Sequence, residues 1–277
     1  MPSTLYIVAT PIGNLEDITY RAVRILQQAD LIAAEDTRHT LQLLRALDIQ
    51  KPLVSLHEHN EQKRIEEIAC LLDEGKDIAL VSDAGTPCIS DPGARLVQAL
   101  GKKYTIVPIP GPSAVITALS ATGLTQGGFS FYGFLPVKGK ERKQILARIQ
   151  RRTQTAVLYE SPHKLLKTLE DLSLYCENPL LCIGRELTKV YEEFVTDTAQ
   201  HLLLHYQSRP PKGEFVLMIP VAQNQESQTP DTQRIMDLMQ QYKEEGLRHK
   251  QAAEQAALQM GISKKTAYEI GLKIFHR

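Results

Sequence analysis

Short apolar runs alternate with amphipathic stretches through the first 115 residues. The amphipathic stretches at 18–29, 41–47, 61–74 and 94–100 place apolar residues on one helical face and predict helices. The apolar runs, bounded by turn residues, predict strands at 4–9, 31–34, 53–56, 78–81 and 105–107. Strand-plus-helix units in succession predict a parallel sheet covered by helices.

The second half of the chain has a less regular pattern. Strands are predicted at 129–134, 155–159, 180–183, 191–195 and 215–221, and helices at 138–152 and 165–175. With fewer helices than strands, we expect some strands to pair antiparallel. The fold class predicted is therefore α/β, with two α/β domains, a cleft between them and a small helical tail. The expected boundaries are 1–120, 121–222, a polar linker at 223–232 and the tail at 233–277.

The tail carries a pattern similar to a helix-turn-helix between 250 and 270. Ala257 and Gly261 lie four residues apart at the packing and turn positions, and Ser263 is placed to cap the second helix. From residue 232 onward the tail has eight Lys/Arg and five Asp/Glu. Two interpretations stay open: a nucleic-acid contact, or a small docking bundle.

Each predicted strand of the first half ends in a polar or turn-rich cluster. The longest is the loop at 82–93, which holds two Asp, two Ser, two Pro and two Gly. The other clusters lie at residues 10–17, 35–38, 57–60 and 108–114. Parallel strands place their carboxyl ends at one edge, where open α/β sheets bind ligands. The sequence therefore predicts a ligand cleft formed by these loops.

Composition limits the classes of partner. Among 277 residues, 32 basic and 32 acidic side chains give a formal net charge of +0, so only local basic patches could serve a nucleic acid. Trp is absent, which argues against a surface dominated by base stacking. The four Cys form no C-x-x-C pair and predict reduced core residues of a cytoplasmic protein. Residues 104–137 carry no charge, but Pro and Gly interrupt them, so we expect a buried or cleft-lining segment and no membrane span.

Several cofactor motifs are missing from the sequence. There is no G-x-G-x-x-G and no G-x-x-x-x-G-K-[ST], which argues against the usual dinucleotide and triphosphate sites. His57-Glu58-His59 lacks the helical spacing of a zinc motif, and we expect no metal. A cleft rich in Gly, Pro, Asp and Ser without a phosphate cradle suits a nucleoside-like ligand without phosphates, such as S-adenosylmethionine. Asp83 could accept hydrogen bonds from its ribose or amine.

Seven segments together resemble the tetrapyrrole methylase superfamily, and within it the branch that acts on bacterial ribosomal RNA. The segments are Thr10-Pro-Ile-Gly-Asn-Leu-Glu-Asp-Ile-Thr19, Ala34-Glu-Asp-Thr-Arg38, Ser82-Asp-Ala-Gly-Thr-Pro87, Ser90-Asp-Pro-Gly93, Pro110-Gly-Pro-Ser-Ala114, Tyr159-Glu-Ser-Pro-His163 and Arg185-Glu-Leu-Thr-Lys189. The superfamily often has a Gly-rich first loop and a Gly-Asp-Pro in the second, whereas this chain has Thr-Pro-Ile-Gly-Asn and Ser-Asp-Ala-Gly. This departure favours RNA over a porphyrin substrate.

The resemblance implies a function and a partner set. It implies S-adenosylmethionine in the cleft between the two domains, a homodimer, and 2′-O-methylation of a cytidine in the decoding region of 16S rRNA. We expect that RNA within the small ribosomal subunit, and naked rRNA is the alternative. The residues that would line the cofactor site by motif are Pro11, Ile12, Ser82, Asp83, Ala84, Thr86, Ser113, Ala114 and Tyr159. The alternatives are a methylase of the same fold acting on a tetrapyrrole or protein, and a non-enzymatic RNA-binding protein that senses the cofactor.

A ribose hydroxyl is a poor nucleophile near pH 7, so a base within hydrogen-bond reach would add about 10²–10⁴-fold. The hypothesis assigns that role to Glu160, Glu35 or Asp36, each at a strand end. The expected phosphate ligands are Arg38, Lys164, Arg185 and Lys189. A second RNA-binding hypothesis is the basic stretch 138–152, with seven Lys/Arg and one Glu. For each carboxylate an ordinary ion pair is the alternative, and for the basic stretch a solvated helix face.

Overall fold

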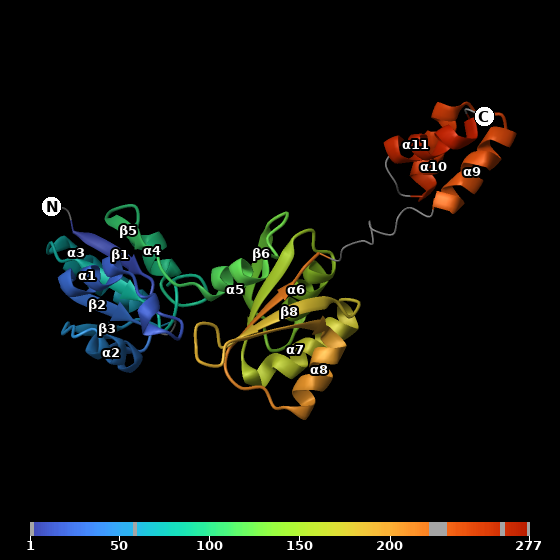
Figure 1. Ribbon diagram of the computed structural model, residues 1–277. Coiled ribbons are helices and arrows are strands. Elements are labelled where there is room, and N and C mark those ends of the chain that lie inside the picture. The colour runs from blue at the N-terminus through green and yellow to red at the C-terminus, as the bar shows by residue number, and fades with distance from the viewer. Residues whose placement is uncertain (1–2, 58–59, 222–231, 261–263, 276–277) are drawn as a thin grey trace. The chain divides into compact units, whose positions relative to one another are not determined.

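The structure is a computed structural model that describes residues 3–57, 60–221, 232–260 and 264–275. The chain divides into two compact units, residues 1–221 and 222–277 (Figure 1). No helix in these ranges is both long and apolar enough to cross a membrane.

The first sheet confirms the predicted parallel arrangement. Its strands are β1 (Thr4–Val8), β2 (Leu31–Ala34), β3 (Leu53–Ser55), β4 (Ile78–Val81) and β5 (Thr105–Ile109). They lie in the order β3-β2-β4-β1-β5, and every pairing is parallel. The chain therefore runs from β1 to one side of the sheet, returns to β4, and crosses β1 to reach β5. The reversal places β1 and β4 side by side at the switch point, where such sheets bind ligands.

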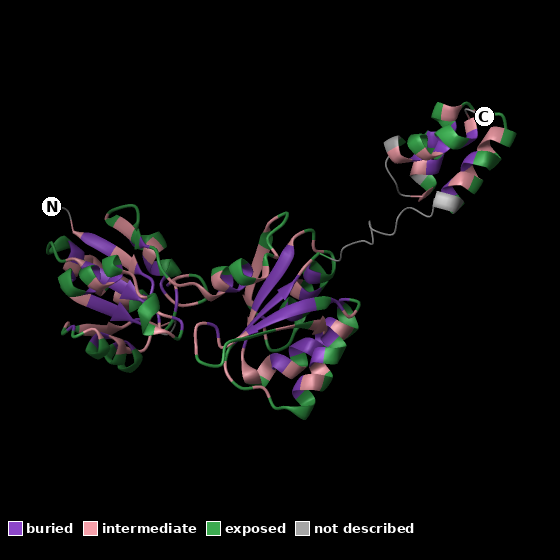
Figure 2. Cartoon of the chain, viewed as in Figure 1, coloured by how far each residue is buried: buried purple, intermediate pink, exposed green. Residues whose placement is uncertain are grey.

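Helices cover both faces of the first sheet. One face packs against α1 (Tyr20–Gln28) and α2 (Thr37–Ala46), and the other against α3 (Glu61–Asp73) and α4 (Ala94–Leu100). Alternate residues of β4 serve the two faces, since Ala79 packs with α1 and α2 while Leu80 packs with α3 and α4. Burial on both faces explains why these strands read as unbroken apolar runs (Figure 2).

The second sheet is mixed, as predicted. Its strands are β6 (Phe129–Phe134), β7 (Thr155–Glu160), β8 (Leu180–Arg185), β9 (Glu193–Thr198) and β10 (Phe215–Ile219), in the order β6-β7-β10-β8-β9. Only β6 and β7 pair parallel. β10 runs antiparallel between β7 and β8, and its register sets Phe215 opposite Glu160. The start of β10 therefore lies at the carboxyl end of β7.

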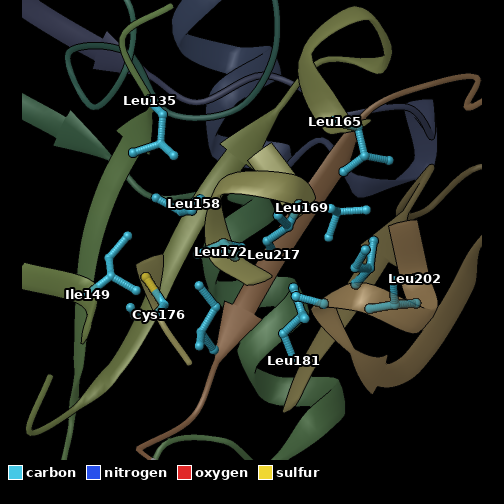
Figure 3. Close-up of a cluster of buried hydrophobic side chains, with 14 of the residues drawn as sticks. Leu135, Ile149, Leu158, Leu165, Leu169, Leu172, Cys176, Leu181, Leu202 and Leu217 are labelled. Atoms are coloured by element: carbon cyan, nitrogen blue, oxygen red, sulfur yellow. The ribbon is translucent and has the colours of Figure 1, made fainter. Parts of the chain in front are cut away.

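Three helices cover one face of the second sheet. These are α6 (Lys140–Gln150), α7 (Pro162–Tyr175) and α8 (Ala199–Ser208). Their leucines meet those of the strands in one apolar cluster, in which Leu158, Leu169 and Leu217 have no exposed surface (Figure 3). The opposite face packs against α5 (Ala114–Thr122), through Val115, Ala118 and Leu119.

Helices α5 and α8 were not expected from the sequence pattern. α5 is small and apolar on nearly every side, so its sequence shows little amphipathic periodicity. It lies within the charge-free segment and packs against the second sheet, although the expected domain boundary at 120 cuts through it. The start of α2 also differs, because the helix begins at Thr37, where Asp36 caps it, instead of at 41.

Burial corrects one expectation about the cysteines. All four are free thiols; Cys176 and Cys182 are buried and Cys88 is half-buried. Cys70 is exposed, because it lies on the outward side of α3 while Ile68 and Leu72 point into the core. Cys70 is therefore not a core residue.

The second unit is a bundle of α9 (Thr232–Glu244), α10 (His249–Met260) and α11 (Lys264–Phe275) around its own apolar cluster. Its core holds Ile235, Met239, Ala253 and Ala267. Of the expected helix-turn-helix positions, Ala257 is half-buried in α10, whereas Gly261 and Ser263 lie outside the described residues, as does the expected linker except for its last residue.

Candidate functional site

The loops after β1 and β4 are joined directly. Thr10 N–H donates to Gly85 O at 2.8 Å, and Gly85 N–H donates to Thr10 O at 3.0 Å. Thr86 Oγ1 in turn donates to Pro112 O, in the loop after β5, at 3.0 Å. The polar strand-end clusters that follow β1, β4 and β5 therefore converge at the switch point of the sheet.

A pocket of about 410 Å³ opens where these loops meet the second sheet. The first sheet contributes the loops after β1, β2, β4 and β5, through residues such as Ile12, Glu35, Asp83 and Ser113. The second sheet contributes the ends of β6 and β7 and the start of β10, through Phe134, Tyr159, Glu160 and Val216. A pocket lined by apolar walls and a few convergent polar groups is the usual form of a small-molecule site.

The pocket lining is acidic. Among the residues that the structure describes, five carboxylates and no Lys, Arg or His line it; the carboxylates are Glu35, Asp83, Asp91, Glu160 and Glu214. Such a site attracts a cationic ligand and repels phosphates and carboxylates. Within the described ranges, no group of three or more His, Cys, Asp or Glu is arranged to hold a metal ion.

Most of the residues expected to line a cofactor site do line this pocket. They are Ile12, Asp83, Ala84, Thr86, Ser113, Ala114 and Tyr159. Pro11 is not among the lining residues, and Ser82 is only 3% exposed, with its hydroxyl 3.4 Å from Ala84 O. Ser82 therefore stabilises the loop on the side away from the cavity and does not reach the cavity.

Tyr159 forms an aromatic wall of the pocket. Its ring packs edge-on against Phe131 and Phe134, with centroids 4.8 and 5.7 Å away. Its hydroxyl oxygen accepts a hydrogen bond from Val115 N–H at 3.2 Å, which ties β7 to α5. Burial raises the pKa of Tyr159, so the phenol stays neutral and suits a flat, uncharged ring as a neighbour.

Glu160 is held by the interior of the second domain. It is 1% exposed, and its two oxygens accept from Thr168 Oγ1 at 2.6 Å and from Ser161 N–H at 2.9 Å. Thr168 Oγ1 also accepts from Arg142 Nη2 at 3.1 Å, and Arg142 Nε lies 2.7 Å from Asp171 Oδ2. Both oxygens of Glu160 thus have donors, which favours a positioning role over proton removal.

The geometry argues against Asp36 as a base. Its side chain accepts from Arg38 N–H at the start of α2 and pairs with the Arg38 guanidinium at 2.6 Å. These hydrogen bonds lower the pKa of Asp36 to about 2, and Asp36 does not line the pocket. Its backbone N–H instead donates to Asp83 Oδ1 at 3.0 Å, which orients that pocket carboxylate. Glu35, by contrast, does line the pocket.

Two of the four expected phosphate ligands are engaged within the chain. Lys189 Nζ pairs with Glu186 at 2.9 Å and with Glu214 at 3.0 Å, and these ion pairs argue against the expected role of Lys189 on RNA. Arg185 donates to Lys212 O and pairs with Glu193.

The other two expected phosphate ligands are Arg38 and Lys164. Arg38 is 88% exposed, although it is paired with Asp36. Lys164 is half-buried and has no ion pair among the described residues.

Two pocket carboxylates, Asp91 and Glu214, were not identified from the sequence. Asp91 lies in the longest loop, but the sequence does not show that both Asp residues of this loop face the cavity. Glu214 reaches the pocket only because β10 runs antiparallel to β7. Burial raises the pKa of Asp91, a hydrogen bond from Ser82 opposes that rise, and the nearby charge of Asp83 adds to it.

Comparison with known proteins identifies a family that matches most of this chain. Residues 4–203 match the tetrapyrrole (corrin/porphyrin) methylases. A ribosomal RNA small subunit methyltransferase I from Synechocystis sp. is 43% identical over 272 residues, covering 98% of each chain. Proteins of the same name from Halalkalibacterium halodurans and Escherichia coli O157:H7 are each 45% identical, covering 96% and 97% of this chain and 94% of their own.

Solved structures share the fold at lower identity. A diphthine synthase superimposes with a TM-score of 0.63 at 15% identity, covering 79% of this chain and 90% of that one. A uroporphyrin-III-C-methyltransferase from Thermus thermophilus gives 0.55 at 21% identity, covering 78% and 94%. The parallel first sheet, the mixed second sheet and the sequence matches agree: the chain belongs to the tetrapyrrole methylase family of methyltransferases.

Proposed function

We propose that this methyltransferase uses S-adenosylmethionine to methylate small-subunit ribosomal RNA, at the ribose 2′-hydroxyl of a cytidine in the decoding region. The observation that carries the proposal is the acidic lining of the pocket, which contains no Lys, Arg or His. S-adenosylmethionine bears a sulfonium and an ammonium and no phosphate, so its charge complements that lining.

The pocket walls also fit the uncharged parts of this donor. The Tyr159 and Phe134 rings offer an apolar surface for the adenine, and Ile12 belongs to the same apolar cluster as Tyr159. Asp83, oriented by the Asp36 N–H, is placed to accept from the ribose diol or the ammonium. When bound, the donor supplies a methyl group on a positively charged sulfur, which leaves as a neutral thioether.

The RNA substrate is supported by the relatives, whose names specify ribosomal RNA of the small subunit. Basic side chains outside the pocket are the proposed phosphate contacts. Arg38 and Lys164 remain in that set, together with the exposed cations of the 138–152 stretch: Lys138, Lys140, Lys143, Arg148 and Arg151. Arg142 and Arg152 are removed from it, since Arg142 is buried against Asp171 and Arg152 Nε donates to Pro220 O.

The remaining expectations extend this proposal. We propose a homodimer that acts in the cytoplasm on the assembled small subunit. A tetrapyrrole substrate is disfavoured because the relatives that match nearly the whole chain are named for ribosomal RNA.

The decisive experiment is a labelling assay. The protein would be incubated with radiolabelled S-adenosylmethionine and small subunits from cells that lack it, and the RNA would then be digested with alkali. A 2′-O-methyl group blocks cleavage of its own linkage, so we expect label in one alkali-resistant dinucleotide. Label in mononucleotides would indicate base methylation, and no RNA label despite donor binding would favour a tetrapyrrole or protein substrate.

A further inference from the structure

A surface groove adjoins the acidic pocket. It is lined by Glu61 of α3 and by residues 88–95, which run from the loop after β4 into α4. Ile89, Ser90 and Asp91 line both the groove and the pocket, so they form the boundary between them. An acceptor that enters along the groove meets the pocket at these three residues.

Asp91 is the one boundary residue whose side chain carries a carboxylate that can act as a base. Ile89 is aliphatic, and the hydroxyl of Ser90 is a very weak base. The described residues show no ion pair to Asp91. This sets it apart from Glu214, which pairs with Lys189, and from Glu160, whose oxygens both accept hydrogen bonds.

We propose that the acceptor hydroxyl reaches the pocket through this groove and that Asp91 removes its proton. The inference rests on the proposed function and deepens it. The acceptor oxygen forms a bond to the methyl carbon, and the carbon–sulfur bond breaks with its electron pair moving to sulfur. The hydroxyl proton passes to the Asp91 carboxylate and then leaves to solvent through the open groove.

The surroundings of Asp91 suit a base. The groups that face it are Ser82 and Asp83 of its own loop, Cys88 beside them and Tyr159 of β7, while Glu61 of α3 lines the same groove next to Cys88. Arg95 of α4 lies at the far end of the groove, 3.9 Å from Glu61, with its side chain 80% exposed. Burial and the nearby Asp83 both raise the pKa of Asp91, which strengthens it as a proton acceptor.

Asp91→Asn tests the assignment, because the amide keeps the size of the side chain and an oxygen for Ser82. We expect the single-turnover rate of methyl transfer to fall by about 10²–10⁴-fold. We also expect the dissociation constant for S-adenosylmethionine, measured by calorimetry, to rise by no more than about tenfold, the cost of one pocket charge, so the larger loss belongs to the transfer step. The wild-type rate should rise with pH through the Asp91 titration, and this limb should vanish in Asp91→Asn and return in part in Asp91→Glu.

Two further measurements make the outcome unambiguous. Glu61→Gln changes a carboxylate that lines only the groove, and it should keep the wild-type pH profile. An infrared titration, taken as the difference between wild type and Asp91→Asn, should show a carboxyl that titrates above the ordinary range of Asp.

An Asp91→Asn variant that transfers methyl at the wild-type rate with the wild-type pH profile would overturn the inference. A carboxyl that titrates at or below the ordinary range would overturn it as well. A wild-type protein that labels no RNA would instead defeat the proposed function, and the infrared titration would still decide whether Asp91 is a strengthened base.

Discussion

The side chain of Lys189 fills the space that a Cβ atom on Gly13 would occupy. That Cβ would lie 2.4 Å from Lys189 Cγ and 2.8 Å from Cε. Gly13 belongs to the loop after β1, and Lys189 follows β8 in the second domain. Since Lys189 Nζ also pairs with Glu214 at the pocket, the close approach couples the first loop to a pocket carboxylate.

Gly13→Ala should therefore weaken donor binding. The added methyl group must displace the Lys189 stem, and overpacking of this kind typically costs about 1–3 kcal/mol. The displacement also disturbs the ion pair with Glu214. We expect a lower urea midpoint and a weaker dissociation constant for S-adenosylmethionine, measured by calorimetry.

Gly13→Ala should also be made in a protein that carries Lys189→Ala, to test whether the contact between these two residues causes the loss. Once the lysine stem is absent, Gly13→Ala no longer has to displace it, so the two substitutions should be non-additive in the free energy of unfolding. Additive costs would mean that Gly13 is required for a reason other than its contact with Lys189.

Asp83→Asn tests the charge of the pocket. Removing one negative charge should weaken the binding of S-adenosylmethionine by about tenfold, or ~1.4 kcal/mol. The demethylated product has a neutral sulfur and should lose less affinity. Calorimetric titrations of both ligands against both proteins measure the difference. Equal losses would show that Asp83 acts through a hydrogen bond to a part that the two ligands share.

Arg142→Ala should destabilise the second domain. The substitution leaves Asp171 buried without its guanidinium and removes a donor to Thr168, and breaking such a pair costs about 3–5 kcal/mol. Urea unfolding measures this loss. Lys143→Ala, on the exposed side of the same helix, is the control and should leave stability unchanged.

The Arg142→Ala and Lys143→Ala variants also distinguish a structural role of this helix from RNA binding. If the 138–152 stretch contacts phosphate, Lys143→Ala should reduce the salt dependence of RNA binding by about one unit of slope. Arg142→Ala should leave that slope unchanged, because its side chain is buried. A slope that falls only for Arg142→Ala would contradict the proposed division of the stretch.

The sequence predicted the layers of this fold better than the details of its site. Unbroken apolar runs such as 78–81 identify strands that are buried on both faces, and strand-end loops identify the edge where the pocket lies. Glu214 could not be predicted, since the antiparallel register of β10 brings it to the pocket. The ion pair between Asp36 and Arg38 matches the alternative considered for that carboxylate. The pairing of Lys189 with Glu214 could not be predicted, because the spacing of charges along a chain does not show which distant ones pair in space.

Thiol reactivity should follow burial and rise with pH. Cys70 is exposed, whereas burial raises the pKa of Cys176 to about 11. The thiolate is the reactive form, so at pH 8 a maleimide should label Cys70 first and leave Cys176 unmodified until the protein is denatured. Mass spectrometry of peptides from timed samples measures both rates, and Cys70→Ser should abolish the fast phase.

The raised pKa of Cys176 also means that folding favours its neutral thiol. The contribution of this thiol to the free energy of unfolding is therefore complete below pH 9 and is lost as the pH rises toward 11. Rapid labelling of Cys176 in the native protein at pH 8 would instead show that α7 opens at its end on the timescale of the reaction.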